Sequence, residues 1–206
     1  LDPRTASHSG IEAYGPEEAA RLAQAMNEAA PVTVRVNRTK TTRDAMLAEL
    51  RERFPDAAPC RFAPDGIVLG RRGDVGQDPA FVAGKISPQD EASQLVVHWL
   101  DPQPGERILD VCAAPGTKTA AIAERLGRRG QVVALDRHEG RLGLIGRGLR
   151  RLELGGVAVS ERDATKSLTD LPAHGGPFDR ILVDAPCSGL GALRRNPDAR
   201  WRIRPE

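Results

Sequence analysis

The 206-residue sequence predicts an α/β fold in which a parallel sheet follows a smaller α+β unit. From Gly105 onward, strand-like and helix-like segments alternate, which is typical of a parallel sheet with helical crossovers. Before that point the strands are short and separated by single helices. Hydrophobic residues make up 40% of the chain and charged residues 28%, the balance of a folded globular protein rather than a disordered one.

The first half of the chain reads as the α+β unit. We expect helices over 16–29 and after a cap at Thr41 or Thr42, and strands at 32–36, 60–62 and 67–69. Ser87 followed by Asp90 has the form of a capped helix start, and that helix presents Trp99 on its apolar face. We therefore divide the chain into a linker (1–15), a small α+β domain (16–86) and a larger domain (87–206).

The second half supplies the elements of the parallel sheet. Strands are predicted over 107–112, 131–136, 157–160 and 178–184, with helices over 117–126 and 139–152. The apolar run Ile181-Leu182-Val183 indicates a strand that is covered on both faces.

Composition excludes several classes of protein. No apolar run reaches the roughly 20 residues of a membrane helix, so we expect no membrane association. Three scattered cysteines form neither a disulfide framework nor a zinc motif, which predicts a cytoplasmic protein without metal. The net charge is only +2, but 26 of the 30 basic residues are arginines. Arginine suits phosphate recognition, although GC-rich codon usage explains the excess equally well.

The segment Asp110-Val111-Cys112-Ala113-Ala114-Pro115-Gly116-Thr117-Lys118-Thr119 leaves a predicted strand and opens a helix. Ligands of open α/β sheets bind at such strand ends, where small residues allow a close approach to the backbone. Neither of the glycine-rich phosphate-binding motifs is present, which disfavours hydride cofactors and nucleoside triphosphates.

Aspartates also close the other predicted strands, at Asp136, Asp163 and Asp184. Asp136 stands where an acid accepts from ribose hydroxyls, and Asp163 where it can receive an adenine amino group. A helix or turn cap is the competing interpretation for each, and for Asp163 alone it is nearly as good. Together the four strand ends predict an adenosine-type pocket.

These residues resemble a known family. Asp110–Thr119, Asp136, Arg162-Asp163 and the Pro-Cys segment Asp184–Gly191 are similar to motifs of the RsmB/NOP family of S-adenosylmethionine-dependent RNA cytosine-5 methyltransferases. Arg194–Asp198 with Trp201 resembles the bacterial branch that acts on 16S ribosomal RNA. The resemblance covers about residues 14–206. It implies a class I, Rossmann-like methyltransferase sheet, here incomplete, preceded by a small RNA-binding domain.

The resemblance also implies roles for individual residues. The methionine end of S-adenosylmethionine would lie against Cys112, Ala113, Ala114, Pro115, Gly116, Thr117 and Lys118. Asp136 would hold the ribose, Asp163 the adenine, and Asp184 the edge of the methyl-transfer site. Thr117 replaces a glycine of many relatives, a change that the start of a helix should tolerate.

Cys187 lies in the Pro-Cys motif, where the family's cysteine assists product release. The family's nucleophilic cysteine belongs to a later Thr-Cys motif, which these 206 residues lack. The chain also lacks an initial Met. We therefore expect a segment of a longer enzyme, with its nucleophile beyond Glu206 and little turnover of its own. The alternative is that Cys187 is itself the nucleophile, as in DNA cytosine-5 methyltransferases.

We expect RNA to be bound by Arg194, Arg195 and Arg200 beside the Pro-Cys turn, and by Arg35 and Arg38 of the small domain. A solvated loop is the alternative for the first group. The predicted partner is ribosomal RNA, and we expect a monomer. A non-catalytic RNA-binding or assembly protein and a transfer-RNA methyltransferase of the same fold remain the alternative functions.

Overall fold

The computed structural model describes residues 11–28, 30–70, 74–168, 171 and 176–186. The chain separates into two compact units, residues 1–30 with 186–206, and residues 31–185, and each is described by itself. The first unit contains helix α2 (Pro16–Asn27), which opens with a proline and two glutamates, as expected of a helix start. The second unit holds two four-stranded sheets.

The first sheet is small and antiparallel, with strand order β2-β3-β1-β4. The strands are β1 (Val32–Val36), β2 (Ala58–Pro59), β3 (Gly66–Gly70) and β4 (Ile86–Pro88). The short helices are α3 (Arg43–Arg51), η1 (Val75–Gln77) and α4 (Pro79–Val82). Thr42 caps α3, because its hydroxyl accepts a hydrogen bond from the Ala45 N–H at 3.3 Å, which confirms the predicted cap.

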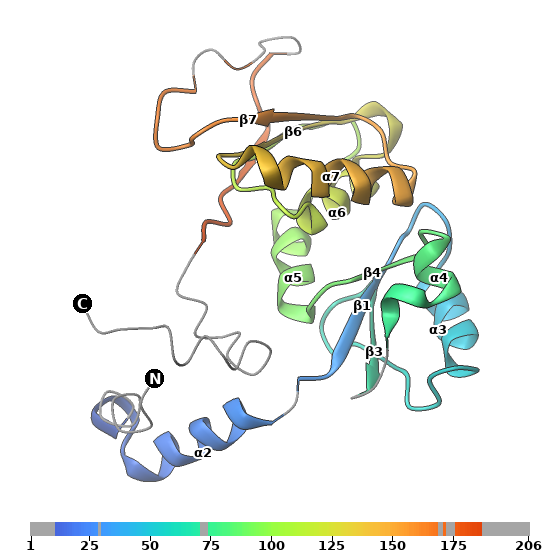
Figure 1. The fold of residues 1–206 in the computed structure, drawn as a ribbon, viewed down its shortest axis with the longest axis vertical. Coiled ribbons are helices and arrows are strands. Elements are labelled where there is room, and N and C mark those ends of the chain that lie inside the picture. Colours follow the sequence, from blue (N-terminus) through green and yellow to red (C-terminus); the bar gives the residue numbers. More distant parts are fainter. Residues whose placement is uncertain (1–10, 29, 71–73, 169–170, 172–175, 187–206) are drawn as a thin grey trace. The chain divides into compact units, whose positions relative to one another are not determined.

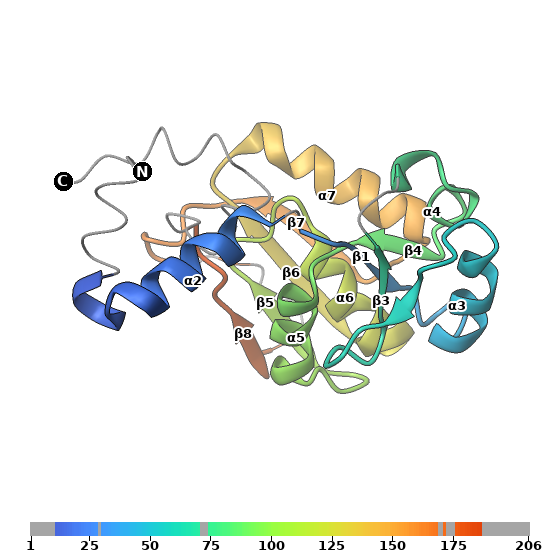
Figure 2. The same ribbon diagram turned by 90° about the horizontal axis from the view of Figure 1, so that it is seen from below.

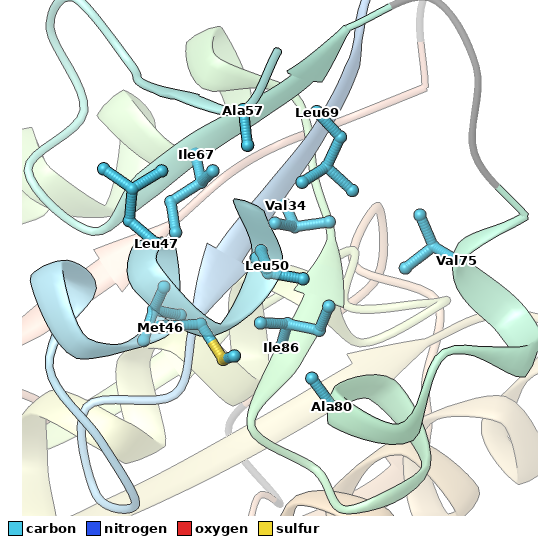
Figure 3. Close-up of a cluster of buried hydrophobic side chains, with 11 residues drawn as sticks. Val34, Met46, Leu47, Leu50, Ala57, Ile67, Leu69, Val75, Ala80 and Ile86 are labelled. Atoms are coloured by element: carbon cyan, nitrogen blue, oxygen red, sulfur yellow. The ribbon is translucent and has the colours of Figure 1, made fainter. Parts of the chain in front are cut away.

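A separate hydrophobic core stabilises this sheet (Figure 3). Met46 and Leu50 of α3 meet Val34, Ile67 and Ile86 of the three longer strands, and all five side chains are fully buried. Apolar spacing predicted α3 and alternation predicted β1, but the prediction that β1 buries only one face is wrong, because Thr33 and Arg35 are buried as well.

Two further predictions in this region are wrong. Residues 60–62 do not form a strand, since β2 lies at Ala58–Pro59. Ser87 does not cap a helix, because it lies in β4 and pairs with Arg35 of β1. The following helix, α5 (Glu91–Leu100), begins after Asp90, which makes no side-chain cap hydrogen bond. Pairing with β1 holds residues 86–88 extended, so the small sheet reaches two residues past the expected boundary at 86.

The second sheet is entirely parallel, with strand order β7-β6-β5-β8. The strands are β5 (Arg107–Asp110), β6 (Gln131–Asp136), β7 (Val157–Glu161) and β8 (Arg180–Leu182). Between them run α6 (Thr117–Leu126), η2 (Gly127–Arg129) and α7 (Glu139–Leu152). Parallel strands alternating with helices confirm the predicted α/β fold, and α6, β6 and α7 match their predicted bounds.

Helices α5, α6 and α7 cover one face of this sheet (Figures 1 and 2). Val97 of α5 and Ile122 of α6 pack with Ile108 of β5 and Val132 of β6. The opposite face, with Leu109 and its neighbours, is covered among the described residues by Leu168, Leu171 and Phe178.

The outer strand β8 departs from expectation. Ile181 is 55% and Val183 67% exposed, so the prediction of a strand covered on both faces is wrong, and only Leu182 is buried. The reason is position, because β8 pairs with β5 alone among the described strands. Trp99 is 77% exposed rather than packed in an apolar face. No helix in the described part of the chain is long and apolar enough to cross a membrane.

Candidate functional site

The four strand-end aspartates gather at one edge of the parallel sheet. Asp110 and Asp136 are the last residues of the inner strands β5 and β6. Asp163 follows β7 by two residues, and Asp184 follows β8 by two. Since all four strands are parallel, their carboxyl ends meet at the same edge, where open α/β sheets bind ligands.

The small-residue loop after β5 approaches the next strand closely. The Ala113 N–H donates to the Leu135 carbonyl at 2.7 Å, and the Gly116 N–H donates to the Ala113 carbonyl at 2.7 Å. Gly116 has φ +102°, and a Cβ there would lie 3.0 Å from Cα of Ile145. Both its backbone conformation and the crowding favour glycine. Thr117, by contrast, is the first residue of α6, which explains why a side chain is tolerated there.

Asp136 and Arg141 hold this loop in place. The Ala114 N–H donates to one oxygen of Asp136 at 3.2 Å, and the His138 N–H donates to the other at 3.0 Å. Arg141 of α7 donates to the Ala114 carbonyl at 2.7 Å and lies 3.6 Å from the Asp136 carboxylate. Both backbone groups of Ala114 are therefore fixed by the strand-end acid and its arginine. Asp136 is 4% exposed, so this arrangement is part of the folded core.

Asp110 is the most buried acid of the edge, at 1% exposure. Thr119 donates its hydroxyl to Oδ2 at 2.7 Å, while Oδ1 has no hydrogen-bond partner among the described residues. Burial raises the pKa of Asp110 to about 6, against the opposing hydrogen bonds from the Thr119 side chain and the Cys112 backbone. Asp110 is therefore a buried carboxyl group with one oxygen that the described side chains leave unbonded.

Cys112 lies half-buried beside these acids. Burial raises the pKa of its thiol, and the charges of Asp110, Asp136 and Asp184 raise it further. A thiol in this setting stays protonated, so Cys112 is unsuited to nucleophilic attack. Burial likewise raises the pKa of Cys60 to about 12, in agreement with a structural role.

The outer aspartates are held by local contacts. Asp163 accepts from the Thr165 N–H at 3.0 Å and from the Thr165 hydroxyl at 2.7 Å, and these bonds lower its pKa. It thus forms the turn cap that was the competing interpretation. Asp184, 45% exposed in its side chain, pairs with Lys118 of α6 at 2.5 Å.

A small hollow opens between the loop and β8. Eight residues line it, namely Asp110, Cys112, Ala113, Ala114, Pro115, Thr117, Lys118 and Asp184. Its volume is about 30 Å³, room for no more than a few water molecules. Oδ1 of Asp110 and the backbone around Gly116, which a side chain does not cover, suit the polar end of S-adenosylmethionine. The donor set therefore fits the expected cofactor. No cluster of metal-ligating side chains occurs in the described residues.

The predicted RNA contacts divide into three groups. Arg35 is 4% exposed, pairs with Glu124 of α6 and donates to Gln89 at 2.7 Å. Its assignment as an RNA ligand is wrong, because alternation on β1 turns this side chain inward against α6. Arg38 remains a candidate, since its side chain is 52% exposed. Cys187 and the predicted contacts Arg194, Arg195 and Arg200 lie outside the described residues.

The sequence placed Thr119 in the segment Asp110–Thr119 without a role of its own, and it did not predict the contacts of Arg141 and Arg151. Arg141 lies in the first turn of α7, where the helix dipole disfavours a cation. A cation at this position is a sequence signal for a nearby acid, which the structure identifies as Asp136. Arg151 of α7 stacks on Phe81 and donates to the Ile86 carbonyl at 2.9 Å. It joins α7 to the small sheet, a tertiary contact that no local pattern announced.

Comparisons with known proteins agree with this arrangement. A family model described as 16S rRNA methyltransferase RsmB/F matches residues 97–206. A second model, described as a ferredoxin-like domain of RsmF/B-like methyltransferases, matches residues 7–76. Both halves of the chain are therefore similar to parts of RsmB/F methyltransferases.

Two curated relatives carry the name ribosomal RNA small subunit methyltransferase B. The protein of Pseudomonas putida is 42% identical over 190 residues, which cover 91% of this chain and 42% of the relative. The protein of Vibrio vulnificus is 43% identical over 195 residues, covering 95% and 45% respectively. The chain thus spans less than half the length of these relatives.

Solved structures share the fold. The crystal structure of PH0851 has a TM-score of 0.85 at 28% identity, covering 96% of this chain and 44% of that one. NSun6 from Pyrococcus horikoshii with SFG has a TM-score of 0.83 over 99% of this chain and 74% of that one, and at 20% identity this shows the fold alone. With a family model matching more than half of its residues, the chain belongs to the RsmB/F family of 16S rRNA methyltransferases, which use S-adenosylmethionine.

Proposed function

We propose that this chain is the donor-binding part of an enzyme that transfers a methyl group from S-adenosylmethionine to C5 of a cytosine in 16S ribosomal RNA. The observation that carries the proposal is the pair of buried inner-strand acids, Asp110 and Asp136, beside the loop of small residues. Family membership and the names of the curated relatives support the RNA substrate. The choice of C5 rests on the Pro-Cys segment of the sequence.

Different residues of the strand ends would bind different parts of S-adenosylmethionine. The backbone of Cys112–Lys118 and the open oxygen of Asp110 would meet the methionine end. Asp136 retains acceptor positions beside its two backbone donors, because a carboxylate accepts about four hydrogen bonds. It would use them for the ribose hydroxyls. Asp163 would serve the adenine side, and Asp184 with Lys118 the edge of the transfer site. The bound donor supplies the methyl group.

Methylation at C5 needs a nucleophilic thiolate. Carbon 5 of cytosine is a poor nucleophile until a thiolate adds to C6, and loss of the C5 proton afterwards expels the thiol. The raised pKa values of Cys112 and Cys60 disfavour both in this role. We assign Cys187 to product release. We expect the nucleophile beyond Glu206, in accord with a chain that covers 42% of its Pseudomonas relative.

The test combines donor binding with transfer. Calorimetry should detect S-adenosylhomocysteine binding to the 206-residue chain at one site. The complete coding sequence should transfer tritiated methyl groups to 16S ribosomal RNA, with the label recovered as 5-methylcytosine. Label on an exocyclic amine, or on transfer RNA instead, would refute the proposed reaction. Donor binding without any transfer by the complete protein would favour the assembly protein.

The 206-residue chain itself should show little transfer. Robust methylation by this chain that disappears in Cys187→Ala would make Cys187 the nucleophile and contradict its assignment to product release. Cys60→Ala is the matched control, because it removes a buried thiol far along the chain from the Pro-Cys turn.

A further inference from the structure

A cavity of about 430 Å³ lies between the small sheet and the helices of the parallel sheet. The loop after β1 contributes Thr39 and Lys40, the end of α6 contributes Gly127 and Arg128, and the segment after α7 contributes Glu153 and Gly156. The volume is more than ten times that of the hollow at the strand ends. Ion pairing between Lys40 and Glu153 at 2.8 Å shows that the two parts meet here.

The cavity lies at the opposite edge of the sheet from the aspartates. Helices α6 and α7 end where the chain turns back toward the first residues of β6 and β7. Their carboxyl-terminal ends therefore mark the amino edge of the parallel strands. The ten residues of α6 separate the two edges by about 15 Å. The cavity is thus a separate surface from the donor site.

Its charge is predominantly positive. Lys40 and Arg128 line the cavity, and Arg129 follows Arg128 in the sequence. Arg128 is exposed and makes no hydrogen bond or ion pair with the described part of the chain. The one lining carboxylate, Glu153, has a side chain that is 77% exposed. An exposed ion pair of this kind is weak, so an incoming anion can replace Glu153 on Lys40.

The lining also indicates what kind of anion fits. No aromatic side chain lines the cavity, so nothing there stacks on a base. Gly127 has φ +63° and a Cβ there would meet no atom within 4 Å, so its backbone is open to close contact, whereas a Cβ at Gly156 would lie 2.9 Å from the Gly130 carbonyl oxygen. A lysine from the loop after β1 and an arginine from η2 line this groove, and such cations suit the repeated phosphates of a nucleic-acid backbone.

We propose that this groove binds the phosphate backbone of the RNA substrate at a point remote from the methylated base. The inference rests on the proposed function for the identity of the RNA. Contacts of this kind position a nucleic acid and carry no sequence preference. RNA bound both in this groove and at the aspartate edge would contact the chain near both ends of α6.

The first test reverses one charge. Arg128→Glu should weaken binding of a transcribed 16S ribosomal RNA fragment about tenfold, measured by fluorescence anisotropy at physiological salt. Arg147→Glu makes the same change at an exposed position on α7 outside the groove, and it should alter the affinity less than twofold. Arg128→Ala should reduce the slope of log affinity against log salt by about one.

The second test removes the competing acid. Glu153→Gln frees Lys40 from its carboxylate partner, so RNA affinity should rise about threefold. Circular dichroism and thermal melting confirm that each variant is folded, and S-adenosylhomocysteine binding should stay unchanged in all of them.

Equal losses of RNA affinity in Arg128→Glu and Arg147→Glu would overturn the proposal that the groove binds RNA. Unchanged RNA affinity in both variants would overturn it as well. Failure of the unaltered chain to bind the RNA would also overturn it. The proposed reaction fails separately, if the complete protein transfers no methyl group to C5 while Arg128→Glu still weakens RNA binding.

Discussion

The inner and outer strands of the parallel sheet hold their aspartates in different ways. Asp110 and Asp136, on the inner strands, are buried and bonded to the loop, to α6 and to α7. Asp163 and Asp184, on the outer strands, are more exposed and held by one neighbour each, Thr165 and Lys118. Strand β6 is buried at five of six positions, whereas β7 has none buried. The inner acids of the proposed donor site are therefore fixed by the fold, whereas the outer ones are more open.

The strongest challenge to this comparison is Asp136→Ala. Donor affinity should fall more than about 100-fold, because both the ribose acceptor and the anchor of Ala114 are lost. The free energy of unfolding should fall by about 3 kcal/mol, since the Ala114 N–H loses its partner in the core. Calorimetry with S-adenosylhomocysteine and urea denaturation measure the two effects.

Asp163→Ala is the matched control for an outer strand. It removes the same carboxylate from an acid that bonds only Thr165 in the described chain, so the free energy of unfolding should barely change. Similar losses of donor affinity and of stability in the two variants would refute the distinction between inner and outer aspartates.

The contrast between buried and exposed charges extends to Arg35 of the small sheet, which is buried. Arg35→Met leaves Glu124, 2% exposed in its side chain, without its partner, and should destabilise the fold by about 3–5 kcal/mol. The double variant Arg35→Met with Glu124→Leu should recover most of that loss, because neither charge is then buried. Urea denaturation measures both. A near-neutral Arg35→Met with weakened RNA binding would restore Arg35 as an RNA contact.

Asp110 provides a test in pH. Its folded pKa of about 6 lies above the ordinary value of 3.8, so the folded state holds the proton more tightly than the unfolded state. Its contribution to stability is therefore fully present below pH 3.8 and is lost as the pH rises through 6. Relative to Asp110→Asn, the natural chain should lose about 2 kcal/mol between pH 4 and pH 7.

Denaturation of both proteins across that range measures the difference, and groups other than Asp110 cancel in the comparison. A constant difference between the two proteins would contradict the raised pKa. Asp184→Asn is a suitable companion, because its charge is one of the causes that raise the pKa of Asp110.

Arg141→Met should have a smaller effect on donor binding than Asp136→Ala. Arg141 fixes the Ala114 carbonyl and the Asp136 carboxylate but does not line the hollow, so its loss should weaken donor binding about tenfold. Arg150→Met, an exposed arginine on the same helix, is the control and should leave donor affinity unchanged. Equal effects in the two would show that Arg141 does not position the loop.

Local patterns predicted most of the fold. The bounds of α6, β6 and α7 follow from periodicity and from glycine and aspartate punctuation, and so does the cap of Thr42 on α3. Ser87 was misplaced because its capping sequence is local, while its pairing with Arg35 is a contact across 52 residues of chain. Long-range pairing overrode the cap.

The candidate site was predictable in position but not in its contacts. Strand-end aspartates identify the carboxyl edge because parallel topology brings them together. The inward turn of Arg35 and the contact of Arg141 with Ala114 depend on how α6 and α7 pack, which no spacing encodes. Charge alone could not separate Arg35, in a buried ion pair, from the exposed Arg38.

Hydrogen–deuterium exchange with and without S-adenosylhomocysteine tests the central claim most directly. We predict that the ligand protects the backbone amides of residues 111–119 and 136–141, the segments that the inner acids hold together. The amides of the small sheet should be unaffected. Protection that is absent from both segments, or that appears only in β1 to β4, would contradict a donor site at the carboxyl ends of β5 and β6.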